Sequence, residues 1–263
     1  MKPKIAASSY LNSAPLIWSF TKGSMAEDVD LTSPVPALCA DLLASGQADA
    51  ALVPVIEFQR MKDLLIVPDV CVGSKGKVLS VVLVSKREDL EGIHSAALDE
   101  SSRTSSTLIK VIFREFIGSE PEWMSARPDL HSMLEANDAA LIIGDPGMTF
   151  ERQGLFVLDL ASLWHRYTGL GFVFAMWMVR KDKVHCIRNI DFARARDEGL
   201  EHIEEIVSDY QERIPLGKAA LLEYLTANIT FFMDQSMRRG LNEFFRLAHK
   251  HGLISSVKQT TFL

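Results

Sequence analysis

The chain has 263 residues, which is enough for one large domain or two small ones with a substantial core. Hydrophobic residues make up 48% and charged residues 24%, values typical of a globular protein. The formal net charge of −6 argues against a general affinity for nucleic acid or anionic membranes, so a bound acid would need a local positive field from helix N-termini, backbone amides or a few arginines.

The first part of the chain predicts strands that alternate with helices. A short strand is predicted over residues 4–10, and Pro15 then favours the first turn of a helix. A second helix is predicted over 36–45, and buried strands are predicted over 50–55 and 78–85.

The next block repeats this order. A strand over 96–99 is followed by the polar turn SSRTSS and a helix over 107–116. Further buried strands are predicted over 139–143 and 172–179. The alternation of strands and helices indicates the α/β class with mostly parallel sheet.

From about residue 191 the pattern becomes helical. Apolar residues recur at helical spacing in three successive segments, of which the last is predicted to begin at Ser236 and to end at Gly252. We therefore expect a helical C-terminal tail.

The cysteines and the N-terminal residues bear on location. Cys39, Cys71 and Cys186 are widely spaced and form no CxxC pair, which favours reduced thiols over a disulfide framework. The N-terminus has no apolar stretch long enough for a signal peptide, and no segment could span a bilayer. We expect a cytoplasmic protein without nucleic-acid or membrane partners, and the oligomeric state stays open.

Seven stretches resemble the chorismate dehydratase family, which shares the fold of periplasmic binding proteins. They are SYLNSAPL (9–16), ADAALVPVIEF (48–58), GKVLSVVLVSK (76–86), ALDESSRTSSTL (97–108), DAALIIGD (138–145), TGLGFVFAMW (168–177) and LLEYLTANI (221–229). Many relatives have arginine where this chain has Ala14, and proline where it has Gly171. The first departure removes a cation, and the second is expected to loosen a turn without changing the chemistry.

The resemblance implies a two-lobed fold of the type II periplasmic binding protein kind. Residues 1–85 and 172–263 would form the first lobe, together with the helical tail, and residues 86–171 the second. Strands 78–85 and 172–179 would cross between the lobes as a hinge, with the ligand in the cleft.

The resemblance also implies a reaction, catalysed by a lyase of menaquinone biosynthesis. In the futalosine pathway, chorismate dehydratase removes water from chorismate to give 3-[(1-carboxyvinyl)oxy]benzoate, or 3-enolpyruvyl benzoate, and no metal or organic cofactor is implied. The reaction is favourable because the product is aromatic. It needs clamps for two carboxylates of a dianionic substrate, a proton acceptor and assistance to a poor leaving group.

The turn SSRTSS is the best candidate for a carboxylate clamp. It follows a predicted strand and opens a helix, so that free N–H groups and the hydroxyls of Ser102, Thr104 and Ser105 could converge on an anion. An ordinary capped turn is the alternative from the residues alone. Arg103 is expected to point away from the substrate, because a helix-start arginine is usually solvated.

Asn12 and Ser80 are the catalytic candidates. The family places an asparagine at the reacting centre, and Asn12 matches it where the first strand gives way to its helix. A carboxamide is too weak a base to act near pH 7, so Asn12 is expected to orient the substrate or stabilise developing charge, with a substrate carboxylate or water taking the proton. An Asx-turn role for Asn12, and a core serine role for Ser80, are the structural alternatives.

Four more residues are candidates for substrate binding. Gly144 and Asp145 end a buried strand, and Asp145 could accept a proton if burial raised its pKa, although capping the turn before Pro146 is slightly favoured. Thr168 and Gly169 precede the return strand and are expected to line the cleft mouth.

Two other functions stay open. One is a solute-binding protein that captures a small anion without chemistry, since fold does not fix function. The other is the later dihydroxynaphthoate synthase of the same pathway, for which we expect a histidine in the cleft, whereas Asp145 follows this chain's IIG strand. The seven histidines show no metal-binding spacing.

Overall fold

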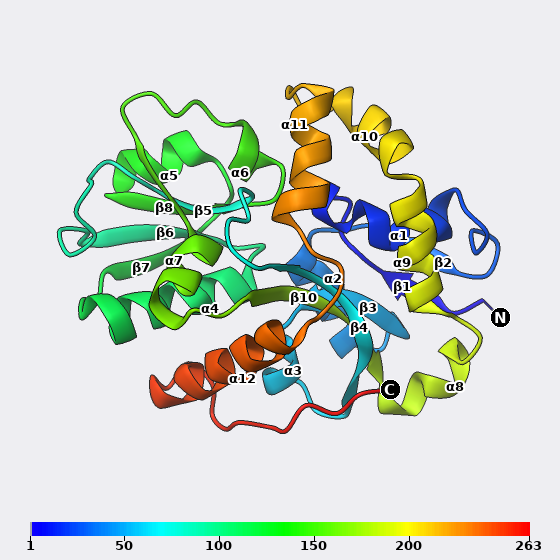
Figure 1. The fold of residues 1–263 in the computed structure, drawn as a ribbon. Helices are drawn as coiled ribbons and strands as arrows, with labels where there is room; N and C mark the ends of the chain where they lie inside the picture. The colour runs from blue at the N-terminus through cyan, green and yellow to red at the C-terminus, as the bar shows by residue number, and fades with distance from the viewer. Residues whose placement is uncertain (1) are drawn as a thin grey trace.

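The computed structural model describes residues 2–263 and contains two five-stranded sheets, which lie side by side in Figure 1. The first sheet has the order β2 (Asp30–Thr32), β1 (Lys4–Ala6), β3 (Ala50–Pro54), β10 (Phe172–Arg180) and β4 (Leu64–Ser74). The second has the order β7 (Glu122–Ala126), β6 (Ser95–Asp99), β8 (Ala139–Ile143), β5 (Val81–Ser85) and β9 (Phe156–Asp159). We call the parts built on these sheets the first and second lobes.

Both sheets are mixed, so the prediction of a mostly parallel sheet is wrong. Strand β1 runs parallel to β2 and β3, and β6 runs parallel to β7 and β8. Strand β10 is antiparallel to both of its neighbours, and so is β5. These two strands enter their sheets directly from the other lobe, without the helical crossover that parallel pairing requires.

Helices cover the sheets and form the tail. The first lobe contains the 3₁₀ turn η1 (Leu11–Ser13) and helices α1 (Ala14–Thr21), α2 (Pro36–Ala44) and α3 (Glu57–Arg60). The second contains α4 (Arg103–Ile112), the π-helical turn η2 (Phe113–Ile117), α5 (Leu130–Ala136), α6 (Pro146–Thr149) and α7 (Leu160–Thr168). The predicted helical tail is confirmed as η3 (Lys181–Lys183), α8 (Val184–Ile187), α9 (Phe192–Glu201), α10 (Ile203–Gln211), α11 (Lys218–Glu223), the π-helical turn η4 (Tyr224–Asn228) and α12 (Gln235–Lys250).

The central strands are the continuous apolar runs of the sequence. Every residue of β3 and β8 is buried, as expected for strands with both faces covered. In residues 2–263 no helix combines the length and the apolar character needed to cross a membrane.

The chain crosses between the lobes in short turns rather than in strands. Strand β5 pairs with β8 and β9, so it belongs to the second sheet, whereas the prediction placed strand 78–85 in the first lobe. The crossing segment is therefore residues 75–80, and residues 169–171 make the return before β10.

Local geometry explains why the strand cannot begin at residue 78. Leu79 has a φ of 64°, and the N–H of Ser80 donates to the carbonyl of Val78 at 2.8 Å, which makes a tight three-residue turn. The Asp159 carboxylate accepts from the N–H groups of Val78 and Leu79, at 3.0 and 2.6 Å for its Oδ2 atom. It also caps α7 by accepting from the N–H of Ser162 at 2.9 Å. Asp159 thus fixes the crossing segment to the second lobe.

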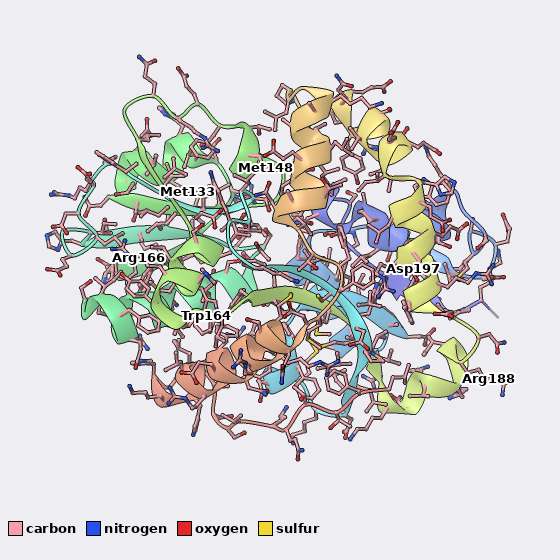
Figure 2. All side chains as sticks on the ribbon, in the orientation of Figure 1. Met133, Met148, Trp164, Arg166, Arg188 and Asp197 are labelled. Atoms are coloured by element: carbon pink, nitrogen blue, oxygen red, sulfur yellow. The ribbon has the colours of Figure 1, made fainter. Side chains whose placement is uncertain are left out.

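Helix α12 lies against the return segment at Gly171. A Cβ atom at Gly171 would lie 2.7 Å from the Met237 side chain, and the Gly171 N–H donates to the Ser236 hydroxyl at 3.2 Å. A residue with a Cβ atom at this position would press on Met237, and a proline would also remove the N–H donor, so Gly171 has a packing role besides its place in the turn. Trp164 of α7 packs edge-on against Phe244 of α12, in the region where Figure 2 labels it.

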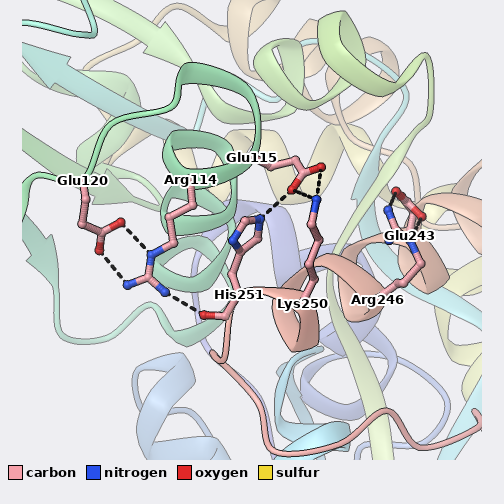
Figure 3. Close-up of polar contacts among 7 residues, drawn as sticks. All are labelled: Arg114, Glu115, Glu120, Glu243, Arg246, Lys250 and His251. Atoms are coloured by element: carbon pink, nitrogen blue, oxygen red, sulfur yellow. Dashed lines mark hydrogen bonds and ion pairs between the residues drawn. The ribbon is translucent and has the colours of Figure 1, made fainter.

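The C-terminal end of α12 is fixed to the second lobe by charge (Figure 3). Glu115 of η2 accepts from Lys250 at 2.7 Å and from the His251 ring at 2.6 Å. Hydrogen bonding to Lys250, followed by that to His251, lowers the pKa of Glu115. Arg114 donates to Glu120 at 2.6 Å and to the His251 carbonyl at 2.8 Å. The tail therefore contacts both lobes.

Helix α9 packs on α1 at Gly199. A Cβ atom there would lie 1.9 Å from the carbonyl oxygen of Pro15, which is a backbone atom that cannot rotate away. This contact presses α9 onto the start of the helix that follows Asn12.

We expect Gly199→Ala to lower the free energy of unfolding by about 2 kcal/mol, because overpacking outweighs the gain in helix propensity of about 1 kcal/mol. Urea denaturation measures the change. Gly217→Ala is the matched control, since a Cβ atom at Gly217 meets nothing within 4 Å. Equal stability of the two variants would contradict the packing described for α9.

Candidate active site

A cavity of about 60 Å³ lies between the two lobes. Its polar wall comes from four residues of the first lobe and from the turn that opens α4, namely Ser8, Tyr10, Asn12 and Ser13, with Ser101, Ser102, Thr104 and Ser105 opposite. Its apolar wall includes Leu52, Val72 and Phe174. Among the residues that the structure describes, those lining the cavity include no charged side chain and no histidine.

Asn12 stands on the first-lobe wall, in η1. Its carboxamide oxygen accepts from the Ser13 hydroxyl at 3.2 Å, and the Ser13 and Ser8 hydroxyls are 3.0 Å apart. The Asn12 oxygen is thereby used within the wall, which leaves the carboxamide N–H₂ as the group able to donate to a ligand.

The start of α4 forms the facing wall. The first N–H groups of a helix have no partner within it and carry the positive end of the helix dipole, so this wall suits an anion. Ser102 is the N-cap residue but its side chain caps nothing, which leaves its hydroxyl available. The Thr104 hydroxyl accepts from the Ile56 N–H of the first lobe at 3.3 Å.

Arg103 points away from the cavity, as predicted. Its guanidinium donates to Asp41 at 2.6 Å and to Glu57 at 3.3 Å, both in the first lobe. Among the described residues that line the cavity, the groups suited to a negative ligand are therefore backbone N–H groups, hydroxyls and the Asn12 carboxamide, together with the dipole of α4.

Sequence reasoning did not single out Tyr10 or Asp99. The Tyr10 ring packs on Gly144, where a Cβ atom would lie 2.8 Å from the ring and where φ is +67°. Behind the start of α4, one Asp99 carboxylate oxygen accepts from the Ser101 hydroxyl at 2.6 Å, and the other is buried without a partner. Burial raises the pKa of Asp99, against the opposing effect of the hydrogen bonds from Ser101. The position of Asp99 at the end of β6, before SSRTSS, is the feature of the sequence that could have identified it.

Asp145 links the lobes. Its carboxylate accepts from the Leu11 N–H of the first lobe at 3.0 Å and makes no capping bond to α6, so the prediction that it caps the turn before Pro146 is wrong. It is not among the residues that line the cavity. Burial raises its pKa to about 6, against the opposing effects of the Leu11 hydrogen bond and of Arg213.

Of the other predicted residues, Gly144 lines the cavity, whereas Ser80, Thr168 and Gly169 lie behind or away from its wall. Ser80 is fully buried; its hydroxyl accepts from Tyr224 at 2.7 Å and its carbonyl accepts from the Gly144 N–H at 2.8 Å. Thr168 donates to the Trp164 carbonyl at 2.7 Å, and Gly169 ends α7 with a φ of 68°. Neither Thr168 nor Gly169 lines the cavity.

The cavity is small, with a volume of about 60 Å³. Binding sites for small organic ligands are typically several times larger, so a ring-containing acid can enter only if the lobes separate.

Comparison with known proteins gives a consistent result. A family model described as menaquinone biosynthesis matches residues 3–250. Chorismate dehydratase of Thermus thermophilus is 31% identical over 229 residues, which cover 80% of this chain and 83% of that protein.

Solved structures share the fold. Protein AF1704 of Archaeoglobus fulgidus superposes with a TM-score of 0.75 at 18% identity, over 96% of this chain and 98% of that one. The Candida albicans CA3427 gene product, which has the generic periplasmic binding protein fold, gives a TM-score of 0.66 at 13% identity, over 98% and 92% of the two chains. The predicted fold class is confirmed.

We expect Asp145→Asn to become more stable relative to the unsubstituted protein as pH rises from about 4 to 7. In the native state the pKa of Asp145 is about 6, above the ordinary value of 3.8, so the native state binds more protons than the unfolded state between these pH values. Ionisation of this carboxyl group therefore lowers the free energy of unfolding of the unsubstituted protein as pH rises. Over the whole range the two proteins should differ by about 3 kcal/mol in the pH-dependent part of the free energy of unfolding, because one unit of difference in pKa corresponds to about 1.4 kcal/mol.

Denaturation at several pH values measures this difference. Asp138→Asn is the control with the opposite sign, because hydrogen bonds from the N–H groups of His94 and Ser95 lower the pKa of Asp138. That variant should lose stability relative to the unsubstituted protein only as pH rises toward about 4, and the difference between the two should stay constant above about pH 5. Parallel curves for the two variants would contradict the assignment of Asp145.

Proposed function

The chain belongs to the menaquinone biosynthesis family, and we propose that it is a hydro-lyase that converts chorismate to 3-enolpyruvyl benzoate and water. The observation that carries this proposal is the cavity between the lobes, whose wall joins Asn12 to the start of α4. Its donors suit the two carboxylates of chorismate, and its apolar side suits a six-membered ring.

The start of α4 is the clamp in this mechanism. One substrate carboxylate accepts from the free N–H groups of the first helical turn and from the hydroxyls of Ser102 and Ser105. Thr104 supports the clamp from the side through its bond with the Ile56 N–H. A clamp of dipoles rather than cations binds an acid only when water is excluded, which fits a cavity closed by two lobes.

Asn12 acts on the developing charge. The reaction removes the proton from the ring carbon that bears the ether, and the carbanion is delocalised through the diene onto the ring carboxylate. Hydroxide then leaves from the neighbouring carbon, and the ring becomes aromatic. The Asn12 carboxamide donates to the oxygen that gains charge, while a substrate carboxylate or water takes the proton, since an amide does not titrate near neutral pH.

A solute-binding protein without chemistry is the second candidate, because proteins of that fold superpose on this chain. The dihydroxynaphthoate synthase alternative is weakened by the absence of histidine among the described residues that line the cavity.

We also place the protein in the cytoplasm. Cys39, Cys71 and Cys186 are free, and burial raises the pKa of both Cys39 and Cys71 to about 12. Free thiols of this kind are typical of a reducing compartment.

The purified protein should consume chorismate without added cofactor, with loss of the diene absorbance and a product lighter by one water. Absorbance and mass spectrometry follow the two changes. Folded protein that leaves chorismate intact but binds it would favour the solute-binding alternative. Folded protein that leaves chorismate intact but converts cyclic dehypoxanthine futalosine would favour the synthase.

Asn12→Ala should keep its fold and lose about 100-fold in kcat, the usual effect of removing one donor to developing charge. Asn242→Ala is the matched control, because Asn242 is exposed on α12 and is not among the residues that line the cavity. Steady-state kinetics and thermal melting separate activity from stability. An Asn12→Ala variant with unchanged kcat would exclude the proposed role.

A further inference from the structure

Tyr224 brings together the two catalytic candidates from a part of the chain remote from both. Its hydroxyl donates to the Ser80 hydroxyl at 2.7 Å, and Tyr224 is only 1% exposed. Burial raises the pKa of Tyr224, and Ser80 and, more weakly, Asn12 oppose this rise. The phenol is thus bonded to Ser80 of the crossing segment and is influenced by Asn12 of the cavity wall.

Tyr224 remains a hydrogen-bond donor at every working pH. Burial raises its pKa well above the ordinary value, and the contacts with Ser80 and Asn12 oppose this only in part. Since a hydroxyl has one hydrogen, a Ser80 oxygen that accepts from Tyr224 keeps its own hydrogen for another acceptor. Tyr224 therefore fixes the direction in which the Ser80 hydroxyl donates.

The helical tail is built to hold Tyr224 in this place. The N–H of Ile229 donates to the Tyr224 carbonyl at 3.1 Å, a spacing of five residues that marks η4 as a π-helical turn. Single π-helical turns of this kind are frequent at functional sites. From the same turn, Asn228 donates to the Lys77 carbonyl at 3.1 Å.

The tail also continues the first sheet next to the crossing segment. The N–H and carbonyl of Thr230 bond to Gly73, at 2.9 and 3.0 Å. Residues 224–230 therefore contact the chain at Gly73, Lys77 and Ser80, over the whole length of the crossing. The strained φ of Leu79 is held between these contacts and Asp159.

We propose that Tyr224 is a positioning residue for the dehydration, acting through Ser80 and Asn12; this rests on the proposed function. It does not contact the clamp at α4, which binds the substrate carboxylate. Loss of its hydroxyl therefore affects the reacting centre and leaves substrate binding intact.

The test is Tyr224→Phe, which removes one oxygen and keeps the ring. We expect kcat to fall about tenfold, equivalent to about 1.4 kcal/mol, with KM changed less than about twofold. Tyr210→Phe is the matched control, because the Tyr210 hydroxyl is also buried in the tail and donates to the Ser9 carbonyl at 2.7 Å. Both variants should lose similar stability, and only Tyr224→Phe should lose kcat.

A double-mutant cycle with Ser80→Ala tests the route of the effect. Ser80→Ala should lower kcat with KM unchanged, and adding Tyr224→Phe should then lower kcat by less than Tyr224→Phe does alone. Additive losses would overturn the action through Ser80. If Tyr224→Phe failed to fold, Ser80→Ala would decide alone, since normal kcat in that variant overturns the proposal.

The unsubstituted protein separates this proposal from the function. If Tyr224→Phe converts chorismate with the same kcat as the unsubstituted protein, the role of Tyr224 is overturned and the proposed function stands. No turnover by the folded unsubstituted protein overturns both.

Discussion

The two lobes depend on one carboxylate at the point where the chain passes between them. Asp159 accepts from Val78 and Leu79 and at the same time caps α7, so the crossing segment and a helix of the second lobe share one anchor. A left-handed Leu79 is costly, and it persists because these bonds offset the strain. The position of Ser80, and the start of β5, follow from this turn.

The proposed dianionic substrate needs a local positive field, because the protein as a whole is acidic. The cavity wall has no charged residue in the described chain, and Arg103 is engaged by Asp41 and Glu57. The departure to Ala14 is consistent with this arrangement, since Ala14 is buried and does not line the cavity. Hydrogen bonds from neutral donors to an anion are stronger where water is excluded, so they would strengthen when the lobes close and weaken when the lobes open. This property suits release of the anionic product proposed above.

The helical tail is more than a cover for the first sheet. Its π-helical turn reaches the crossing segment, α12 packs on the return segment at Gly171, and the end of α12 pairs with Glu115 of the second lobe. Both passages between the lobes are therefore in contact with the same C-terminal stretch. Any relative motion of the lobes would therefore involve the tail.

The sequence by itself determined the strands with the strongest local signal and the candidates at their ends. The apolar runs of β3, β8 and β10 were predicted because strands buried on both faces need continuous hydrophobic sequence. The exposed edge strands β2 and β7 lack that signal. Strand β4 was missed because Pro68 and Asp69 resemble a turn, whereas pairing with β10 tolerates them as an irregularity.

Only the tertiary structure decided which candidates meet. Asn12, Ser102, Thr104 and Ser105 could be placed on the cavity wall from their positions at the ends of strands. The partners of Asp145, Ser80 and Gly171 are Leu11, Tyr224 and Ser236, each distant in the chain. No periodicity encodes such contacts, because they arise from the way two lobes and a tail pack together, and local sequence reports only on local geometry and burial.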